Sequence, residues 1–105
     1  MKVYYLAHTA KPTASSPHYK TLKAAYVNTW VVSENAKQAT LSAAKNIRSC
    51  QWEVVSLEQE PIETTLEDCP SPEAESQFLK ARQIGIATVF AAAGIDESGK
   101  YVSSN

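Results

Sequence analysis

Residues 25–49, AYVNTWVVSENAKQATLSAAKNIRS, change their hydrophobic period halfway. Up to Val32 the side chains are β-branched or aromatic and alternate between two faces, which predicts a strand. From Ser33, which is expected to be the N-cap, small apolar side chains recur at helical spacing. Since a strand followed directly by a helix usually folds that helix back onto its own sheet, this stretch restricts the chain to folds that combine a sheet with helices.

The inner face of the predicted helix is thin. Its members are almost all small: Ala36, Ala39, Thr40, Ala43, Ala44 and Ile47. Such a face lets the helix backbone lie close to the sheet, with larger strand residues expected beneath it. Leu41 points away from this face, toward solvent or a second helix.

In all, strands are predicted at residues 2–8, 24–32, 50–58, 62–65 and 86–93, with a long loop at 9–23. The first of these has apolar side chains on both faces, which is typical of a strand covered on both sides. A second helix is expected to begin at the cap Ser71 with Pro72 in its first position, and to end at Gly85 in a left-handed turn. Its predicted inner stripe is Ala74, Phe78, Ala81 and Ile84.

The order of these elements predicts the α+β class, as a two-layer sandwich of four to five strands with two helices on one face. Residues 1–93 would form a single domain, followed by a polar C-terminal tail at 94–105. Residues 24–93 resemble the ferredoxin-like plan, with residues 2–8 as an added strand. The chain also resembles small uncharacterised bacterial α+β proteins, through its aromatic strand, its capped alanine helix, its tryptophan strand and a helix-to-strand turn. The residues of that turn are Phe78, Ala81, Gly85 and Phe90.

The composition is that of an ordinary globular chain of 105 residues, with 44% hydrophobic and 20% charged side chains. No apolar run approaches the ~20 residues of a membrane-spanning helix, so no membrane association is expected. The N-terminal MKVYYLAHTA is too short and mixed for a secretory signal, which favours a cytoplasmic location. Cys50 and Cys69 have neither the number nor the spacing of a disulfide scaffold and are predicted to be free thiols.

Charge is segregated along the chain, although the net charge is only −1. Residues 1–33 contain four lysines and no acid, whereas residues 53–75 contain eight acids and no base. The acidic segment 53–75 could steer a protein partner, or the two blocks could simply be solvated loops of opposite sign. No basic stripe with interleaved aromatic residues is present, so nucleic-acid binding is not expected.

No motif for catalysis or for cofactor binding is recognisable. The candidate metal ligands His8, His18, Cys50 and Cys69 lack any known spacing, and neither cysteine lies in a nucleophile motif. The three glycines form no phosphate-binding loop. We therefore assign no catalytic residue, metal or cofactor from the sequence.

The strand aromatic residues are the remaining functional signal. Tyr26, Asn28 and Trp30 share one face of their strand, and we predict that this face points away from the helices. Together with Trp52 and His8 they would form a binding patch on an open sheet face, which a second copy would cover as a homodimer. The alternative is that all of these aromatic side chains are core residues.

Two functions follow from this patch. The first is a small protein-interaction or regulatory module that self-associates through the open sheet face. The second is a cofactor-free small enzyme of the dimeric α+β barrel, monooxygenase-like type, with Asn28, Trp30 and His8 as candidate residues. A closed pocket lined by these polar groups would favour the enzyme, and a flat or filled face would favour the interaction module.

Overall fold

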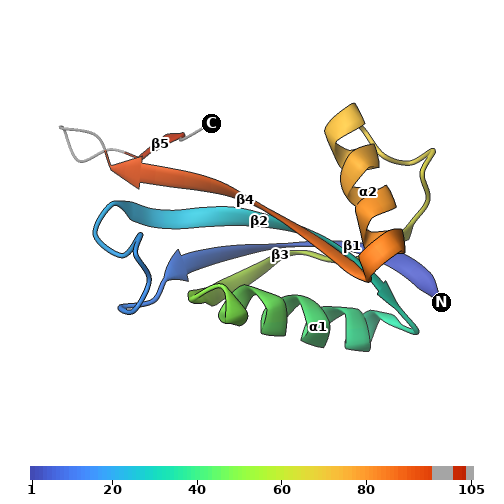
Figure 1. Cartoon of the computed structure of the whole chain (residues 1–105), viewed down its shortest axis with the longest axis horizontal. Coiled ribbons are helices and arrows are strands. Elements are labelled where there is room, and N and C mark those ends of the chain that lie inside the picture. The colour runs from blue at the N-terminus through green and yellow to red at the C-terminus, as the bar shows by residue number, and fades with distance from the viewer. Residues whose placement is uncertain (96–100, 104–105) are drawn as a thin grey trace.

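The computed structural model describes residues 1–95 and 101–103, and it consists of an antiparallel sheet with a helix on each face (Figure 1). The elements are β1 (Lys2–Pro12), β2 (Leu22–Ser33), α1 (Ala36–Ser49), β3 (Trp52–Thr64), α2 (Pro72–Ile84), β4 (Ile86–Ile95) and β5 (Tyr101–Ser103). Their order in the sheet is β3-β1-β2-β4-β5, and every neighbouring pair is antiparallel. The α+β class predicted from the sequence is therefore confirmed.

The first strand lies inside the sheet rather than beside it. β1 pairs with β2 from Lys2 to Ala10 on one side and with β3 from Val3 to Pro12 on the other. β2 and β3 are consequently parallel to each other, separated by β1 and connected through α1. The separate edge strand predicted at 62–65 is the end of the long β3. The ferredoxin-like order of strands is not confirmed.

The two helices lie on opposite faces, so the prediction of two helices on one face is wrong. α1 covers the face that carries Tyr4 and Leu6 of β1, whereas α2 covers the face that carries Val3. Figure 1 shows α1 running below the sheet and α2 standing above one end of it. The physical reason is in β1 itself, because its side chains are apolar on both faces and both faces must be shielded from water.

Beneath α1 the central part of the predicted alanine face packs closely, whereas Ala36, predicted on the same face, is exposed in the first turn of the helix. Ala39, Ala43 and Ile47 are fully buried against side chains of the sheet. Leu41 points off this face and is 55% exposed. The predicted cap is wrong by two residues. Asn35 is the N-cap, and its side chain accepts a hydrogen bond from the Gln38 amide.

Ser33 instead ends β2. It is buried, and its hydroxyl donates to the Asn35 carbonyl at 3.0 Å. This bond fixes the short turn that leads from the strand into α1.

The start and end of α2 follow the sequence signals. The Ser71 hydroxyl accepts from the Ala74 amide at 3.1 Å, Pro72 opens the helix, and Gly85 ends it at a φ of 99°. A small cluster lies between this helix and the sheet: Ala74, Phe78 and Ala81 of α2 with Val3, Trp30 and Ala87 of the strands. Ile84, predicted on the inner stripe, is 63% exposed and does not belong to this cluster.

The connections are shorter than expected. β1 and β2 extend into the predicted loop at 9–23 and leave residues 13–21 between them. The predicted tail at 94–105 falls partly on residues 96–100 and 104–105, outside the described residues; Gly94 and Ile95 belong to β4, and Tyr101–Ser103 forms β5. In the part of the chain that the structure describes, neither helix is long and apolar enough to cross a bilayer.

Candidate functional site

The side of the sheet that carries α2 is only partly covered. The strand registers arrange its side chains in rows that run across β3, β1, β2 and β4. The row nearest α2 is Ile62, Tyr5, Trp30 and Ala87; the next is Gln59, Ala7, Asn28 and Val89; the third is Ser56, Thr9, Tyr26 and Ala91. We call the second and third rows the open rows, since α2 packs on the first.

A polar pair links the covered row to the open rows. The Tyr5 hydroxyl donates to Asn28 Oδ1 at 2.5 Å, and the Tyr5 ring lies 5.1 Å from the Trp30 ring. Trp30 is held from above by α2, so it fixes the Tyr5 ring, and Tyr5 in turn fixes the Asn28 amide. The Asn28 side chain is thereby oriented rather than free to rotate.

A groove of about 670 Å³ lies over this pair. Tyr5, Asn28, Trp30 and Val89 contribute to its sheet side. The loop that leads into α2, together with the first turns of that helix, contributes the other side, including Cys69 and Glu73. The groove therefore has an apolar, aromatic floor and carboxylates at its rim.

Two ionisable groups of the groove, the Tyr5 phenol and the Cys69 thiol, have raised pKa values, which favours their neutral forms. Burial, and to a smaller extent the neighbouring Tyr26, raise the pKa of the Tyr5 phenol. Burial and the surrounding carboxylates raise the pKa of the Cys69 thiol. A thiol with a raised pKa is a weak nucleophile, so this arrangement suits binding better than covalent catalysis.

The structure brings together three of the five predicted site residues. Tyr26, Asn28 and Trp30 do share one face, but that face is the one on which α2 packs. The prediction that it points away from the helices is therefore wrong for Trp30, which is 8% exposed, whereas Tyr26 lies beyond α2 and is 43% exposed. Val27 and Val31 lie beneath α1 on the opposite side.

His8 and Trp52 are not part of this face. Both are buried on the α1 side, where Trp52 packs against Phe90 with ring centroids 5.3 Å apart. His8 Nδ1 is buried without a hydrogen-bond partner among the described residues, and so is the Thr29 hydroxyl. Burial lowers the pKa of the His8 imidazole, which disfavours its charged form. The sequence could not show the strand register that places His8 and Trp52 on the other side, and β3 also shifts register between Val54 and Ser56.

Tyr5 is the residue of the groove that the sequence reasoning missed. Tyr5 belongs to the strand predicted at residues 2–8, but nothing in the sequence showed that β1 pairs directly with β2. The observed strand register explains its position, because it sets Tyr5 beside Trp30 and Ala7 beside Asn28. Ala7 has a small side chain and leaves space for the Tyr5 hydroxyl to reach Asn28.

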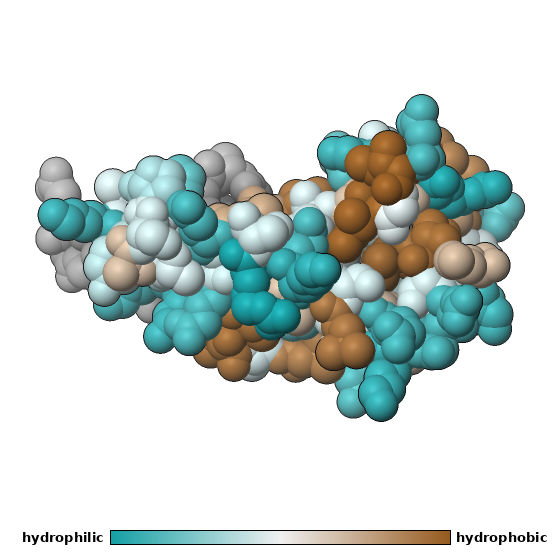
Figure 2. Space-filling view, turned by 60° about the horizontal axis from the view of Figure 1, so that its bottom comes forward, coloured by the Kyte–Doolittle hydropathy of each residue, from teal (hydrophilic) through white to brown (hydrophobic). Residues whose placement is uncertain are grey.

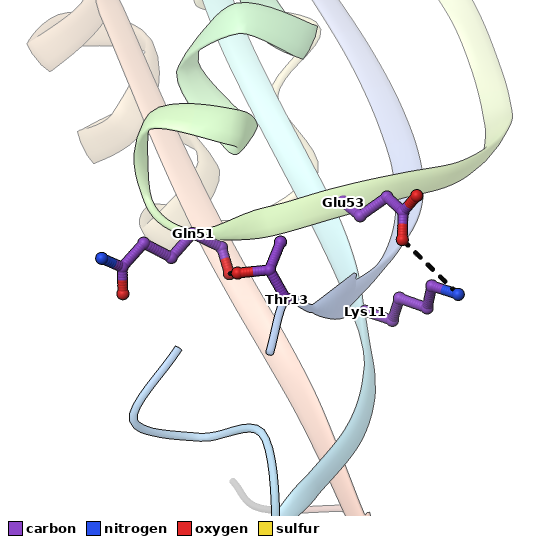
Figure 3. Close-up of polar contacts among 4 residues, drawn as sticks. All are labelled: Lys11, Thr13, Gln51 and Glu53. Carbon is purple, nitrogen blue, oxygen red and sulfur yellow. Dashed lines mark hydrogen bonds and ion pairs between the residues drawn. The ribbon is translucent and has the colours of Figure 1, made fainter. Parts of the chain in front are cut away.

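A second cleft, of about 760 Å³, lies at the opposite end of the sheet, where β1 leads into the loop at 13–21. Lys11, paired with Glu53 at 3.4 Å, lies at this end, and the Gln51 carbonyl accepts from both the amide and the hydroxyl of Thr13 (Figure 3). Gln51 has a φ of 65° just after α1, a conformation that usually belongs to glycine. The bonds from Thr13 hold this turn in place, so we interpret these contacts as structural.

Among the described residues there is no group of three or more histidine, cysteine or acidic side chains that could hold an ion. Cys50 and Cys69 are both free thiols, as predicted.

Comparisons of the chain with protein-family models, with curated proteins and with solved structures found no match. The resemblance to small bacterial α+β proteins therefore stays a prediction.

Proposed function

We propose that this protein is a small interaction module that self-associates through the open rows of the α2-side face. The observation that carries the proposal is the exposure of large apolar side chains there: Tyr26 is 43% exposed and Val89 is 37% exposed. They lie on adjacent strands, next to the oriented Asn28 amide. Exposed apolar side chains among polar ones, with a fixed amide beside them, are typical of a protein–protein interface.

The shape of the chain restricts how two copies can meet. α2 stands on this face at one end only, and the molecule is elongated, with extents of 44 × 26 × 21 Å. If two copies faced each other with the same ends together, their α2 helices would collide and hold the sheets apart. A two-fold arrangement with opposite ends together places each α2 beside the open rows of the other copy.

The charges favour the same arrangement. At the α2 end the carboxylates outnumber the bases: Glu63, Glu67, Asp68, Glu73 and Glu75 against Lys2, Lys80 and Arg82. At the loop end the described bases outnumber the acid: Lys11, Lys20, Lys23 and Arg48 against Glu53. An arrangement with opposite ends together therefore brings an acidic surface to a basic one, which steers association and selects the orientation.

Figure 2 shows a further difference between the ends. The end that carries α2 has a broad apolar surface, whereas the loop end is mostly polar. Leu79 and Ile84 of α2 are large apolar residues that are at least half exposed. They would gain cover from a copy lying beside the helix.

Sedimentation velocity tests the proposal. The wild-type chain is expected to be a dimer at micromolar concentration, and Tyr26→Glu should weaken the dimer by at least tenfold, because it places a carboxylate in the apolar contact. Leu41→Glu is the matched control, since it changes an exposed apolar residue on α1 and should leave the dimer intact. A wild-type monomer at high concentration would contradict the proposal.

Ionic strength tests the orientation separately. Because the acidic and basic ends meet, raising the salt concentration should weaken the dimer. If Tyr26→Glu weakens the dimer but salt does not, the contact through the open rows is supported and the proposed orientation of the two copies is contradicted.

A cofactor-free enzyme is the second candidate, and the groove over Tyr5 and Asn28 is the observation that favours it. Asn28 and Trp30 contribute to this groove, whereas His8 lies on the other side of the sheet and cannot take part. An aromatic ligand could lie on the Trp30 and Tyr5 rings and be hydrogen-bonded by the Asn28 amide. Quenching of the tryptophan fluorescence by small aromatic compounds, weakened in Asn28→Ala, would support this candidate.

A further inference from the structure

The two outer edges of the sheet differ in how they are protected against pairing with another strand. β3 forms one edge. On the other side, β5 pairs only with Ala93, Gly94 and Ile95 of β4. Residues 86–92 of β4 pair with β2 on their inner side, and on their outer side they have no partner strand among the described residues. Half of the backbone N–H and C=O groups of an edge strand point outward, which makes any such edge a template for strand addition.

The β3 edge carries the usual protection. Its sequence, WEVVSLEQEPIET, contains four carboxylates and a proline: Glu53, Glu58, Glu60, Glu63 and Pro61. Its pairing with β1 also shifts register in three places. Charges, proline and irregular pairing are the features that prevent strand addition in natural sheets.

The β4 edge has none of these features between residues 86 and 92. That stretch, IATVFAA, contains no charged residue, no proline and no glycine. Its pairing with β2 is regular from Ile86 to Ala93, so the strand is not distorted away from a neighbour. Val89, in the middle of the stretch, is 37% exposed.

We propose that a second copy of the chain adds to this edge, so that two β4 strands pair antiparallel across a two-fold axis at Val89. An axis normal to the sheet keeps the α1 sides of the two copies together and pairs residues that point to the same side. The register centred on Val89 then sets Val89 opposite its own copy, Thr88 opposite Phe90, and Ala87 opposite Ala91. All of these pairs are uncharged, and none is destabilising.

The sequence of the β4 edge favours a second copy of this chain as the strand that pairs with it. A strand with no charge can pair with itself without repulsion. The same two-fold operation on the β3 edge would bring carboxylates of the two copies close together, and like charges on opposing strands are destabilising. The chain thus has one edge that rejects a copy of itself and one that accepts it.

This contact is separate from the face contact proposed above. The face contact buries side chains of the open rows, whereas the edge contact is made by backbone groups of β4. If both exist, two edge-paired sheets pack face to face as a four-chain assembly.

Cross-linking tests the edge contact with the face contact removed. The variant is Val89→Cys with Cys50→Ser, Cys69→Ser and Tyr26→Glu, treated with a short bis-maleimide. Because the two Val89 positions face each other, the cross-linked yield should exceed that of a matched control with Val55→Cys in place of Val89→Cys by about tenfold. Val55 is an exposed residue on the β3 edge.

Hydrogen exchange of the Tyr26→Glu chain gives a second measurement that does not depend on a new cysteine. Amides within residues 86–92 should exchange more slowly as the protein concentration rises, while amides of the β3 edge should not change. Equal cross-linking of the two cysteine variants, or exchange at 86–92 that is independent of concentration, overturns the edge contact. Neither result bears on the face contact, which is tested by Tyr26→Glu in the otherwise wild-type chain.

Discussion

The two sides of the sheet are built from the same four long strands, yet one is closed and the other is half open. Under α1 the small residues of the helix allow the backbone to approach, and Leu6, Val27 and Ile47 are fully buried. Under α2 only the end of the sheet is covered, and Tyr26 and Val89 remain exposed beyond the helix. α1 runs along the sheet, whereas α2 stands on its end, so helix direction rather than helix length sets how much of a face is covered (Figure 1).

The polar groups buried on the closed side are less well satisfied than those on the open side. His8 Nδ1 and the Thr29 hydroxyl are buried there with no partner among the described residues. On the open side the Tyr5 hydroxyl and Asn28 satisfy each other. The comparison indicates that the open side is the better adapted for polar recognition and that the closed side tolerates polar groups at a cost in stability.

The largest expected effect is a loss of folding stability that differs between the part of the α2 side under the helix and the part beyond it. Trp30→Ala should lower the free energy of unfolding by about 3–5 kcal/mol, because it leaves a cavity beneath α2. Tyr26→Ala, on the same strand and side, should change the free energy of unfolding by no more than about 1 kcal/mol in the monomer. Urea unfolding of dilute protein measures both, and equal losses would mean that Tyr26 is as buried as Trp30.

Overpacking tests the closed side. Ala43→Leu should lower the free energy of unfolding by about 1–3 kcal/mol, since Ala43 has no exposed surface and the sheet lies directly beneath it. Ala36→Leu adds the same bulk at an exposed position of α1 and serves as the control. Thermal melts in which the two variants lose the same stability would contradict the close contact of α1 with the sheet.

The buried histidine predicts a pH dependence that belongs to the closed side. Since burial lowers the pKa of His8 in the folded chain, the unfolded chain binds more protons once the pH falls below the ordinary value of about 6.5. Stability should therefore be lost as the pH falls below that value, by at most about 1.4 kcal/mol per pH unit from this group.

Urea midpoints between pH 7.5 and 5 measure this slope. His8→Phe should flatten it, because the substitution removes the buried imidazole. A slope that His8→Phe leaves unchanged would assign the acid sensitivity to other groups.

The smallest expected effect is a gain of folding stability rather than a loss. Thr29→Val removes a buried hydroxyl that has no partner among the described residues and keeps the shape of the side chain, so it should raise the free energy of unfolding by about 1 kcal/mol. Differential scanning calorimetry against the wild type measures the gain. A loss of stability would show that the hydroxyl has a partner, such as a bound water.

Local features of the fold could be predicted from the sequence because local chemistry determines them. Ser71 and Gly85 set the limits of α2, and the alanine spacing set the buried face of α1. The apolar character of both faces of β1 already indicated cover on both sides, and the two-layer prediction did not use it. The cap at Asn35 was missed because Ser33 and Asn35 are both good cap residues and only the turn geometry separates them.

The groove could be predicted only in part. Alternation along β2 correctly placed Tyr26, Asn28 and Trp30 on one side. The pairing of β1 with β2 and β3 is a long-range property, so neither the Tyr5–Asn28 bond nor the separation of His8 and Trp52 from that side could be derived from local patterns. The direction of α2 depends on the same pairing.

The interior position of β1 has a consequence for the synthesis of the chain. Pro12 pairs with Trp52, and Val3 with Thr64, so the first strand made must wait for its second neighbour until about forty to sixty more residues have been added. At translation speeds of about 5–20 residues per second, that side of β1 is without its native partner for roughly 2–12 s. During this interval one edge of the apolar β1 strand in the nascent β1–β2 hairpin is unpaired, which leaves it open to pairing with other chains.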